Sequence, residues 1–593
     1  MRGLLSLCIW LFASILIAQN SEWITKFEKS DFLETPTYDE CVNFSKKIAQ
    51  QSSMVHYLEM GQSPQKRAIP LLIIDKDGLT EAQDIKNTGR LILLVQAGIH
   101  AGEPDGTDAG LLLIRDMVIN KKNLDLLNHV SILFIPSFNV DGLARMSPYN
   151  RINQNGPKEM GWRTNSNNLN LNRDYMKADT PEMRAWLKLF NKYIPDLFID
   201  CHTTDGADYQ YVATYALESF GNMDNHLTSW LSKTYEPYLV EEMNKKQSPI
   251  FPYVTFRNWH DPRSGLIRGV GTPMISQGYV ALQNRIGLLI ETHMLKAYKP
   301  RVFVTYDLIV ATLEIMNVYN EELKELNRNA DLIMSSVSKS PQELTIKYEV
   351  DMSDTSKVDF LGKEYKIVKS DLTGGDWFQY SDVNTTFSLD LFEKQKAKET
   401  VKLPLAYVVP VEWQNVQEIL KAHGLEFFIT NKKVIIDAEF YQFSHQQWAN
   451  SSFEGRQSLQ GFDLKKSERK MELEAGAMVI PVHQRALKVL VYLLEPKADN
   501  SLASWGFFNS IMERKEYAET YVMEKMAREM ITENPELINI FNTWKKENPE
   551  QAKDQWQQTM WFFERTPYWD QKKDVYPIGR IISQDVLFQL GMH

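Results

Sequence analysis

Four short, almost continuously apolar stretches constrain the fold of this 593-residue chain more than any other feature. They lie at residues 91–95, 130–136, 197–199 and 288–290. Strands of this kind are expected where both faces of a sheet are covered, since neither face then meets water. In such sheets the chemistry gathers at the carboxyl ends of the strands. The sequence therefore predicts an α/β fold with a mixed, largely buried sheet flanked by helices.

Three of these stretches are followed by residues that suit a metal centre. Segment 98–103 follows the first strand and places His100 and Glu103 three residues apart in a turn. The third stretch leads to His202, and the fourth leads to Glu291. Two neutral imidazoles and one carboxylate make a three-ligand site whose fourth position is open to water, which is the catalytic pattern. We therefore expect His100, Glu103 and His202 to meet at one metal ion.

The order of the motifs along the chain points to a known family. His-x-x-Glu comes first, followed by Trp162-Arg163, Asn172-Arg173, the second histidine and Leu-Leu-Ile-Glu. This series resembles the M14 metallocarboxypeptidase family over roughly residues 32–325. The resemblance implies a carboxypeptidase-like catalytic domain, which we place at residues 32–326. It also implies that the metal is a single zinc ion.

The resemblance assigns catalytic roles to two further residues. Arg163 would stabilise the oxyanion that forms as the substrate carbonyl is attacked, a task that suits a permanently charged guanidinium. The alternative for Arg163 is a surface ion pair. Glu291 would be the general base that takes a proton from water and passes it to the leaving amine. The alternative for Glu291 is a structural pair with Arg285, because a buried carboxylate needs a partner.

Substrate binding is assigned in the same way. Asn172 and Arg173 would hold the free C-terminal carboxylate of a peptide, and a bidentate arginine contact suits that group. Asp174 replaces an asparagine that is common in the family, so its charge either weakens exopeptidase selectivity or locks the arginine in place. Tyr279 is the candidate for the tyrosine that hydrogen-bonds the substrate.

Composition and the first residues indicate where the protein acts. Charged residues make up 24% of the chain and the net charge is −10, so no basic surface indicates nucleic acid as a partner. A short positive start is followed by an apolar stretch at residues 4–18, which is too brief to span a bilayer. We predict a signal peptide at residues 1–18, a secreted or periplasmic protein and no stable membrane anchor. The alternative is an uncleaved anchor.

The second half of the chain has a different pattern. A helix at residues 302–326 is expected to close the catalytic domain, and the polar segment 327–342 is predicted to be a linker. Residues 343–593 read as an accessory region that is β-rich at first and helical towards the end. No metal, nucleophile or phosphate motif is found in this region.

These observations favour one function over two others. The leading hypothesis is an exported zinc carboxypeptidase that uses metal-activated water to release the C-terminal residue of a peptide or protein. An M14-type amidase acting on acyl-amino acids or cell-wall peptides would keep the same site and change the substrate. A binding protein with a vestigial zinc domain is the third hypothesis, and the presence of every expected ligand, arginine and base speaks against it.

Overall fold

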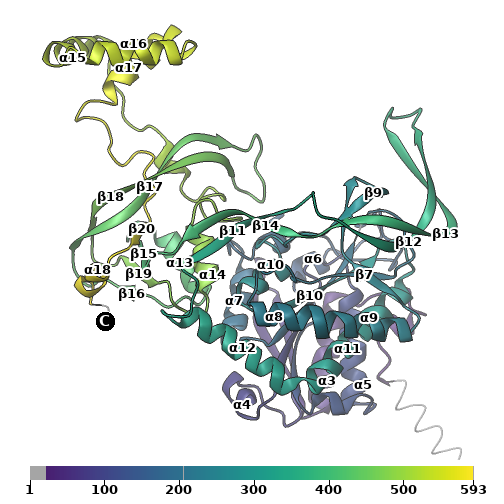
Figure 1. The fold of residues 1–593 in the computed structure, drawn as a ribbon. Helices are drawn as coiled ribbons and strands as arrows, with labels where there is room; N and C mark the ends of the chain where they lie inside the picture. The colour runs from purple at the N-terminus through teal and green to yellow at the C-terminus, as the bar shows by residue number, and fades with distance from the viewer. Residues whose placement is uncertain (1–21, 205, 592–593) are drawn as a thin grey trace, which may run out of the picture.

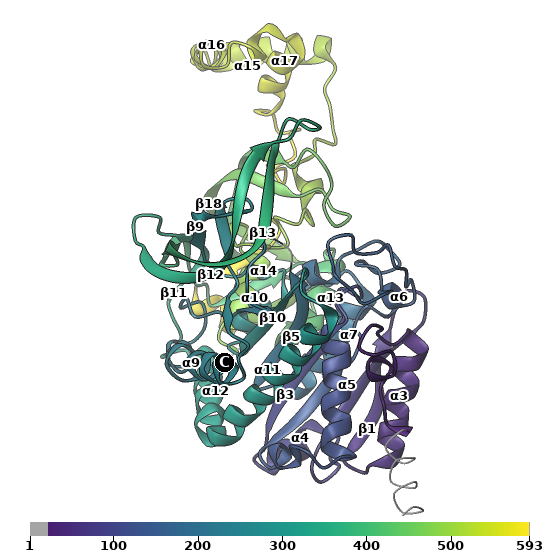
Figure 2. The same ribbon diagram turned by 90° about the vertical axis from the view of Figure 1, so that its right-hand side faces the viewer.

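An eight-stranded mixed sheet forms the centre of the N-terminal half (Figures 1 and 2). The structure is a computed structural model that describes residues 22–204 and 206–591, so the predicted signal peptide lies outside the described residues. In sheet order the strands are β1 (Val55–Gln62), β2 (Ala68–Ile74), β4 (Val130–Ile135), β3 (Leu91–Ala97), β5 (Leu197–Thr204), β10 (Ile286–His293), β6 (Ala213–Ala216) and β7 (Ile250–Pro252). The four central strands, β4, β3, β5 and β10, are parallel to one another, and every residue of β3 and β5 is buried. The predicted α/β fold class is confirmed.

Helices cover both faces of this sheet. One face packs against a cluster that includes residues of α3 (Tyr38–Gln51), α5 (Asp105–Val118), α9 (Glu236–Lys245) and α11 (Tyr298–Val318). The other face packs against α4 (Ala82–Asn87), α7 (Pro181–Tyr193) and α10 (Ser276–Leu282). Because neither face meets water, the strands carry apolar residues at successive positions, as predicted.

The closing helix differs from the prediction. The structure has two helices in place of one, α11 and α12 (Asn320–Ser335), which meet at an angle of 85°. The side chains of Asn317 and Asn320 hydrogen-bond the backbone carbonyls of Leu313 and Asn317, a local pattern that competes with helix continuation. Because α12 extends to Ser335, the predicted linker at 327–342 is helical over more than half of its length.

The second half forms three further sheets (Figure 1). A hairpin of β12 (Ser356–Lys369) and β13 (Asp376–Phe392) continues into β9 (Asp261–Ile267) and β8 (Thr255–Asn258) of the first half. The two-stranded sheet pairs β11 (Glu343–Val350) with β14 (Gln395–Lys402). The six-stranded sheet contains, in order, β16 (Phe428–Ile429), β19 (Met478–Pro481), β15 (Ala406–Val409), β20 (Gly579–Ile581), β17 (Val434–Trp448) and β18 (Leu459–Leu473).

Helices complete the second half. α13 (Gln414–Ala422) and α14 (Leu487–Leu494) pack against the first half, whereas α15 (Thr520–Glu533), α16 (Leu537–Glu547) and α17 (Gln555–Phe563) surround a small core of their own. These last three helices project away from the rest of the molecule in both views (Figures 1 and 2). Residues 22–204 and 206–591 contain no single helix long and apolar enough to cross a bilayer, whereas the bent pair α11 and α12 passes that test by length and composition.

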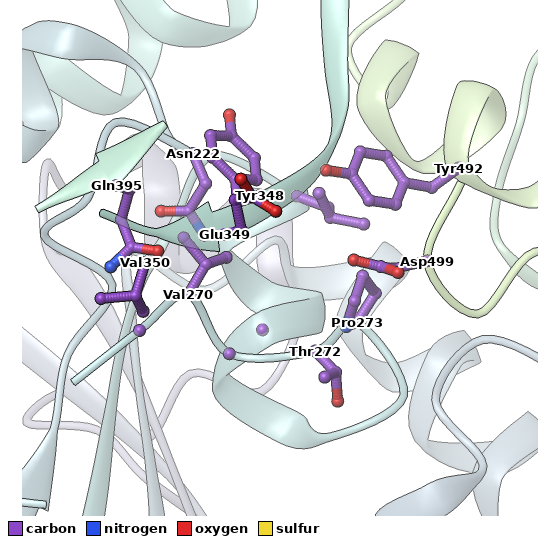
Figure 3. Close-up of a pocket in the computed structure, with 14 residues that line it drawn as sticks. Asn222, Val270, Thr272, Pro273, Tyr348, Glu349, Val350, Gln395, Tyr492 and Asp499 are labelled. Atoms are coloured by element: carbon purple, nitrogen blue, oxygen red, sulfur yellow. The ribbon is translucent and has the colours of Figure 1, made fainter. Parts of the chain in front are cut away.

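The two halves share one hydrophobic core. The cluster that covers the α7 face of the large sheet includes Trp186 of α7 together with Val416 of α13 and Leu490 of α14. A pocket lies where the halves meet, and Figure 3 shows its walls, which come from the loop at residues 269–273, from β11 and from Tyr492 and Asp499. The accessory region is therefore packed against the catalytic region as part of the same folded unit.

A buried acid in α5 should make the stability of the protein depend on pH. Asp108 is 1% exposed and accepts a hydrogen bond from the hydroxyl group of Tyr298, and burial raises the pKa of Asp108 to about 7. An aspartate in an unfolded chain has a pKa of about 3.9, so the folded state alone retains this proton between about pH 4 and 7. The free energy of unfolding should fall as the pH rises through that window.

Asp108→Asn should remove this pH dependence, since the amide resembles the protonated acid. At pH 8 we expect the variant to be more stable than the wild type by about 4 kcal/mol, and at pH 4 the difference should vanish. Thermal unfolding followed by circular dichroism at both pH values measures the effect. The exposed Asp437→Asn serves as the control. An equal difference at the two pH values would contradict this prediction.

Candidate metal centre

Three buried side chains meet where the sheet presents the ends of β3 and β5. His100, Glu103 and His202 are 4%, 2% and 3% exposed, and their ligand atoms all lie within 4.8 Å of one another. This is the set that was expected from the sequence. Two segments that are far apart in the chain, the turn after β3 and the end of β5, are thus brought together by the parallel arrangement of the central strands.

The local structure explains how each ligand reaches the centre. β3 ends at Ala97, and Gly98 follows with φ of +66°, a left-handed conformation that favours glycine. A tight turn then joins the backbone N–H of Glu103 to the carbonyl of His100 at 2.9 Å, just before α5 begins. His202 lies near the end of β5, and Glu291 of β10 is directly beside it in the parallel register. Neighbouring positions in register place their side chains on the same face of a sheet.

Both imidazole rings are oriented by a second hydrogen bond. Their Nδ1 atoms lie 3.2 Å (His100) and 3.0 Å (His202) from Oε2 of Glu103. The opposite Nε2 atoms are held by Asn170 Oδ1 and Asp200 Oδ2, each at 2.9 Å. Outer partners of this type fix the tautomer and the ring orientation of metal-binding histidines.

The donor atoms fit a zinc ion. Two imidazole nitrogens and a carboxylate oxygen are ligands that zinc takes in catalytic sites. With metal–ligand bonds of about 2.0–2.1 Å in a tetrahedral arrangement, neighbouring donors are separated by about 3.3 Å. The separations of 3.0 and 3.2 Å between the histidine nitrogens and Glu103 are close to this value.

Burial and neighbouring charges set the protonation of the ligands. Burial lowers the pKa of His100 to about 4, which keeps this imidazole neutral and able to bind a metal. Burial acts to raise the pKa of Glu103, but His100 and Arg151 outweigh it and hold this pKa well below its usual value. For His202, burial acts to lower the pKa, but the charge of Asp200 outweighs burial and raises the pKa.

Glu291 is a half-buried carboxylate beside the three ligands. Burial raises the pKa of Glu291 to about 8, and the charges of Glu103 and Asp200 add to that rise. Within residues 22–204 and 206–591 no side chain hydrogen-bonds its carboxylate. Arg285 instead pairs with Asp331 through two hydrogen bonds of 3.0 and 2.7 Å. The alternative in which Glu291 forms a structural pair with Arg285 is therefore wrong.

Two arginines approach the centre from the loop before η2 (Leu171–Arg173). Arg163 Nη1 and Arg151 Nη2 lie 3.2 and 2.9 Å from Oε1 of Glu103. Arg163 was expected near the metal ligands, whereas the sequence did not single out Arg151. A side chain at Gly102 would meet the Arg151 side chain at 2.9 Å, so glycine at this position leaves the space that Arg151 fills.

Asn172 and Arg173 follow Asn170, whose side chain contacts both His100 and the backbone of Asn172. The Oδ1 atom of Asn172 accepts a hydrogen bond from the backbone of Ser276 at the start of α10, which fixes the amide group in place. Arg173 donates to the backbone carbonyl of Asn172 at 2.7 Å. Burial and the charge of Arg163 lower the pKa of Arg173, and Glu454, Tyr253 and Glu291 oppose that change. Arg173 thus lies near charged and polar groups from several segments of the chain.

Asp174 fits neither of its two expected roles. Its carboxylate is fully buried and accepts hydrogen bonds from Lys177 Nζ (2.6 Å), from the backbone of Asp179 (3.0 Å) and from both the backbone and the hydroxyl group of Thr180. These contacts hold the turn that starts α7. The charge of Asp174 is therefore compensated by Lys177 and by hydrogen bonds within this turn.

Tyr279 does not face the metal centre. Its side chain is fully buried in α10, and its hydroxyl group is hydrogen-bonded to His423 Nδ1 at 2.8 Å and to Gln283 Nε2 at 2.9 Å. A residue that is enclosed in this way does not contact substrate, so the expectation for Tyr279 is corrected. The sequence places a tyrosine in the right interval but does not reveal that α10 turns its side chain towards the second half of the chain.

Asn170 and Asp200 were missed, although the sequence held a signal for each. Asp200 precedes His202 by two residues in a strand, and residues at this spacing share one face of the sheet. Asn170 precedes the Asn172-Arg173 pair by two residues in a turn where asparagine commonly caps the backbone. No comparable signal marks Arg151, which reaches the centre from a long loop.

Comparisons with known proteins agree with this description. Residues 41–254 match the model of the peptidase family M14, zinc carboxypeptidase. Carboxypeptidase 2 of Trichophyton rubrum is 22% identical over 495 residues, which cover 80% of this chain and 85% of that protein. Carboxypeptidase 2 of Trichophyton equinum is also 22% identical, with the same shares covered. The structure of carboxypeptidase A from Helicoverpa armigera is 15% identical and covers 48% of this chain and 75% of that one, with a TM-score of 0.37.

An α/β sheet with a buried His-Glu-His cluster at its strand ends, and with a glutamate beside it, defines a metal-dependent hydrolase. The matches to relatives extend into the C-terminal half, since they cover 80% of the chain. Residues 41–254 match the M14 zinc carboxypeptidase family, and this match, the relatives and the buried ligand set together support a metallocarboxypeptidase.

Proposed function

We propose that this protein is an exported carboxypeptidase that depends on one zinc ion, held by His100, Glu103 and His202. The observation that carries the proposal is the position of Glu291, which lies in register beside His202 while both histidine Nδ1 atoms face Glu103. Three ligands leave one position of the ion for water or substrate. The apolar stretch at residues 4–18 supports export.

The residues around the ligands have complementary tasks in peptide hydrolysis. Bound zinc would polarise the scissile carbonyl and lower the pKa of a water molecule. Glu291 would accept a proton from the attacking water and donate it to the leaving amine. Arg163 would donate hydrogen bonds to the carbonyl oxygen as negative charge develops there. Proton transfer and charge stabilisation are thereby assigned to different side chains.

Substrate selection would depend on the C-terminal carboxylate. Arg173 carries several N–H donors, and within the described residues its side chain makes one hydrogen bond, to the carbonyl of Asn172. The amide nitrogen of Asn172 has no partner within the described parts of the chain, while its oxygen is held by Ser276. A carboxylate is the group that these donors would bind most strongly, because charge-assisted hydrogen bonds exceed neutral ones.

The direct test combines metal analysis with an assay for release of the C-terminal residue. Purified protein should contain one zinc ion per chain and should release a free amino acid from an N-acylated dipeptide. A chelator should abolish this activity, and added zinc should restore it. Activity that survives complete removal of the metal would overturn the proposal.

Arg173→Ala should raise KM for a peptide with a free C-terminus about 100-fold, since two charge-assisted hydrogen bonds are lost. The rate for the matching C-terminal amide should change little, because an amide offers no charge to Arg173. Steady-state kinetics on the two substrates measure this loss of discrimination. Arg328→Ala, in an exposed pair of α12, is the control. If the wild type already hydrolyses both substrates equally, the amidase hypothesis replaces the exopeptidase one.

A further inference from the structure

The connection between β17 and β18 ends in a tight turn at Phe453–Arg456. Phe453 and Arg456 exchange both backbone hydrogen bonds, at 2.9 and 3.0 Å. The central residues Glu454 and Gly455 have φ of +50° and +73°. Turns with two left-handed central residues favour Asn-Gly, whereas a glutamate adopts this conformation at some energetic cost. The use of Glu454 at this position therefore calls for a compensating contact of its side chain.

Glu454 makes that contact with the catalytic region. Its Oε2 atom accepts a hydrogen bond of 2.8 Å from the backbone N–H of Asn170. Asn170 is the residue whose side chain holds His100 at 2.9 Å and caps the turn that carries Asn172. Glu454 is thus hydrogen-bonded to a residue that lies 284 positions earlier in the chain. That residue, Asn170, contacts both His100 and the turn that carries Asn172 and Arg173.

Arg456 forms the second contact of the same turn. Its Nε and Nη2 atoms donate to Asp179 at 2.7 and 2.6 Å, and its guanidinium group lies 3.6 Å from the centre of the Phe507 ring. Bidentate arginine–carboxylate pairs of this kind restrict both partners strongly. Asp179 also lies 3.4 Å from Lys177, which extends the ion pair into the turn before α7.

The two contacts hold the two ends of one segment. Residues 170–179 begin at the partner of Glu454 and end at the partner of Arg456, and they carry both Asn172 and Arg173 between these points.

We propose that the turn at Phe453–Arg456 positions the substrate-binding segment 170–179, so that the C-terminal half takes part in recognition of the substrate carboxylate. Glu454 and Arg456 are positioning residues in this proposal, because they act through Asn170 and Asp179. The inference rests on the proposed function of Arg173. It gives the accessory region a role in the active site that its sequence does not indicate.

The variants Glu454→Ala and Glu454→Gln separate positioning from charge. Glutamine keeps an oxygen that accepts the hydrogen bond from Asn170, whereas alanine does not. In the full-length zinc enzyme we expect Glu454→Ala to raise KM for an N-acylated dipeptide about tenfold, with kcat changed less than threefold. Glu454→Gln should stay within threefold of the wild type in both constants. Ser452→Ala, an exposed position of the same connection, is the matched control.

Hydrogen–deuterium exchange tests the positioning without catalysis. Peptides that cover residues 170–179 should exchange faster in Glu454→Ala than in Glu454→Gln or in Ser452→Ala, at equal zinc content. Unchanged exchange and KM in Glu454→Ala would overturn the proposal, and so would an equal KM increase in Glu454→Gln. If the wild type releases no C-terminal residue, the proposed function fails, while the exchange comparison still decides whether the turn holds the segment.

Discussion

Glu291→Gln should lower kcat about 10³-fold and leave both the zinc content and the fold of the enzyme unchanged. Glutamine has nearly the same shape as glutamate but takes no proton from water at neutral pH. No side chain within the described residues hydrogen-bonds the Glu291 carboxylate, so the substitution breaks no structural contact there. KM should change little, because the role assigned to Glu291 concerns the reacting water and the leaving amine.

Zinc analysis, circular dichroism and steady-state kinetics on one N-acylated dipeptide measure these effects together. Glu241→Gln, at an exposed position of α9 outside the metal centre, carries the same chemical change and should behave as the wild type. A Glu291→Gln enzyme that retains wild-type kcat would remove Glu291 from the role of general base. A variant that loses its zinc would instead identify the glutamate as a metal ligand.

His202→Ala should bring the zinc content of the purified protein close to zero and reduce peptidase activity to background. The imidazole supplies one of three ligands, and a small side chain at this position leaves too few donors to hold the ion. Asp200→Asn should have a graded effect, with zinc bound about 10- to 100-fold more weakly, because Asp200 orients His202 through Nε2 and its charge makes the ring more basic.

Cys201→Ala provides a matched control from the same strand. Cys201 lies between Asp200 and His202, is buried, and packs where a side chain on Gly106 would lie within 2.8 Å of its sulfur. Alternation along β5 points it away from the ligands. Zinc affinity measured with a competing chelator should be unchanged in this variant. If Cys201→Ala loses zinc as His202→Ala does, the thiol is a ligand and the assigned set is wrong.

Much of the metal centre followed from the sequence because strand ends and turns are local features. His100 and Glu103 lie in one turn, and His202 and Glu291 end apolar strands whose buried character is visible in their composition. Parallel strands then align these ends at one edge without further information. Asp200 could have been added by the same reasoning, from the two-residue period of a strand.

The residues that the sequence misassigned or missed depend on contacts between distant segments. Tyr279 lies in a helix whose orientation is set by packing against Tyr175 and Trp186, and its hydroxyl group is hydrogen-bonded to His423. Arg151 reaches Glu103 from a long loop, for which no periodic pattern predicts the path. Neither position can be derived from local propensity, since each is fixed by partners far along the chain.

The sequence by itself determined the α/β class of the N-terminal half, the candidate metal-ligand set and the glutamate beside it. Each of these depends on apolar periodicity and on short motifs at strand ends. Only the tertiary structure decided that the C-terminal half shares a core with the N-terminal half and that Glu454 and Arg456 contact the segment 170–179. The physical reason is that a single ion pair or hydrogen bond between distant segments leaves no pattern in the residues around it.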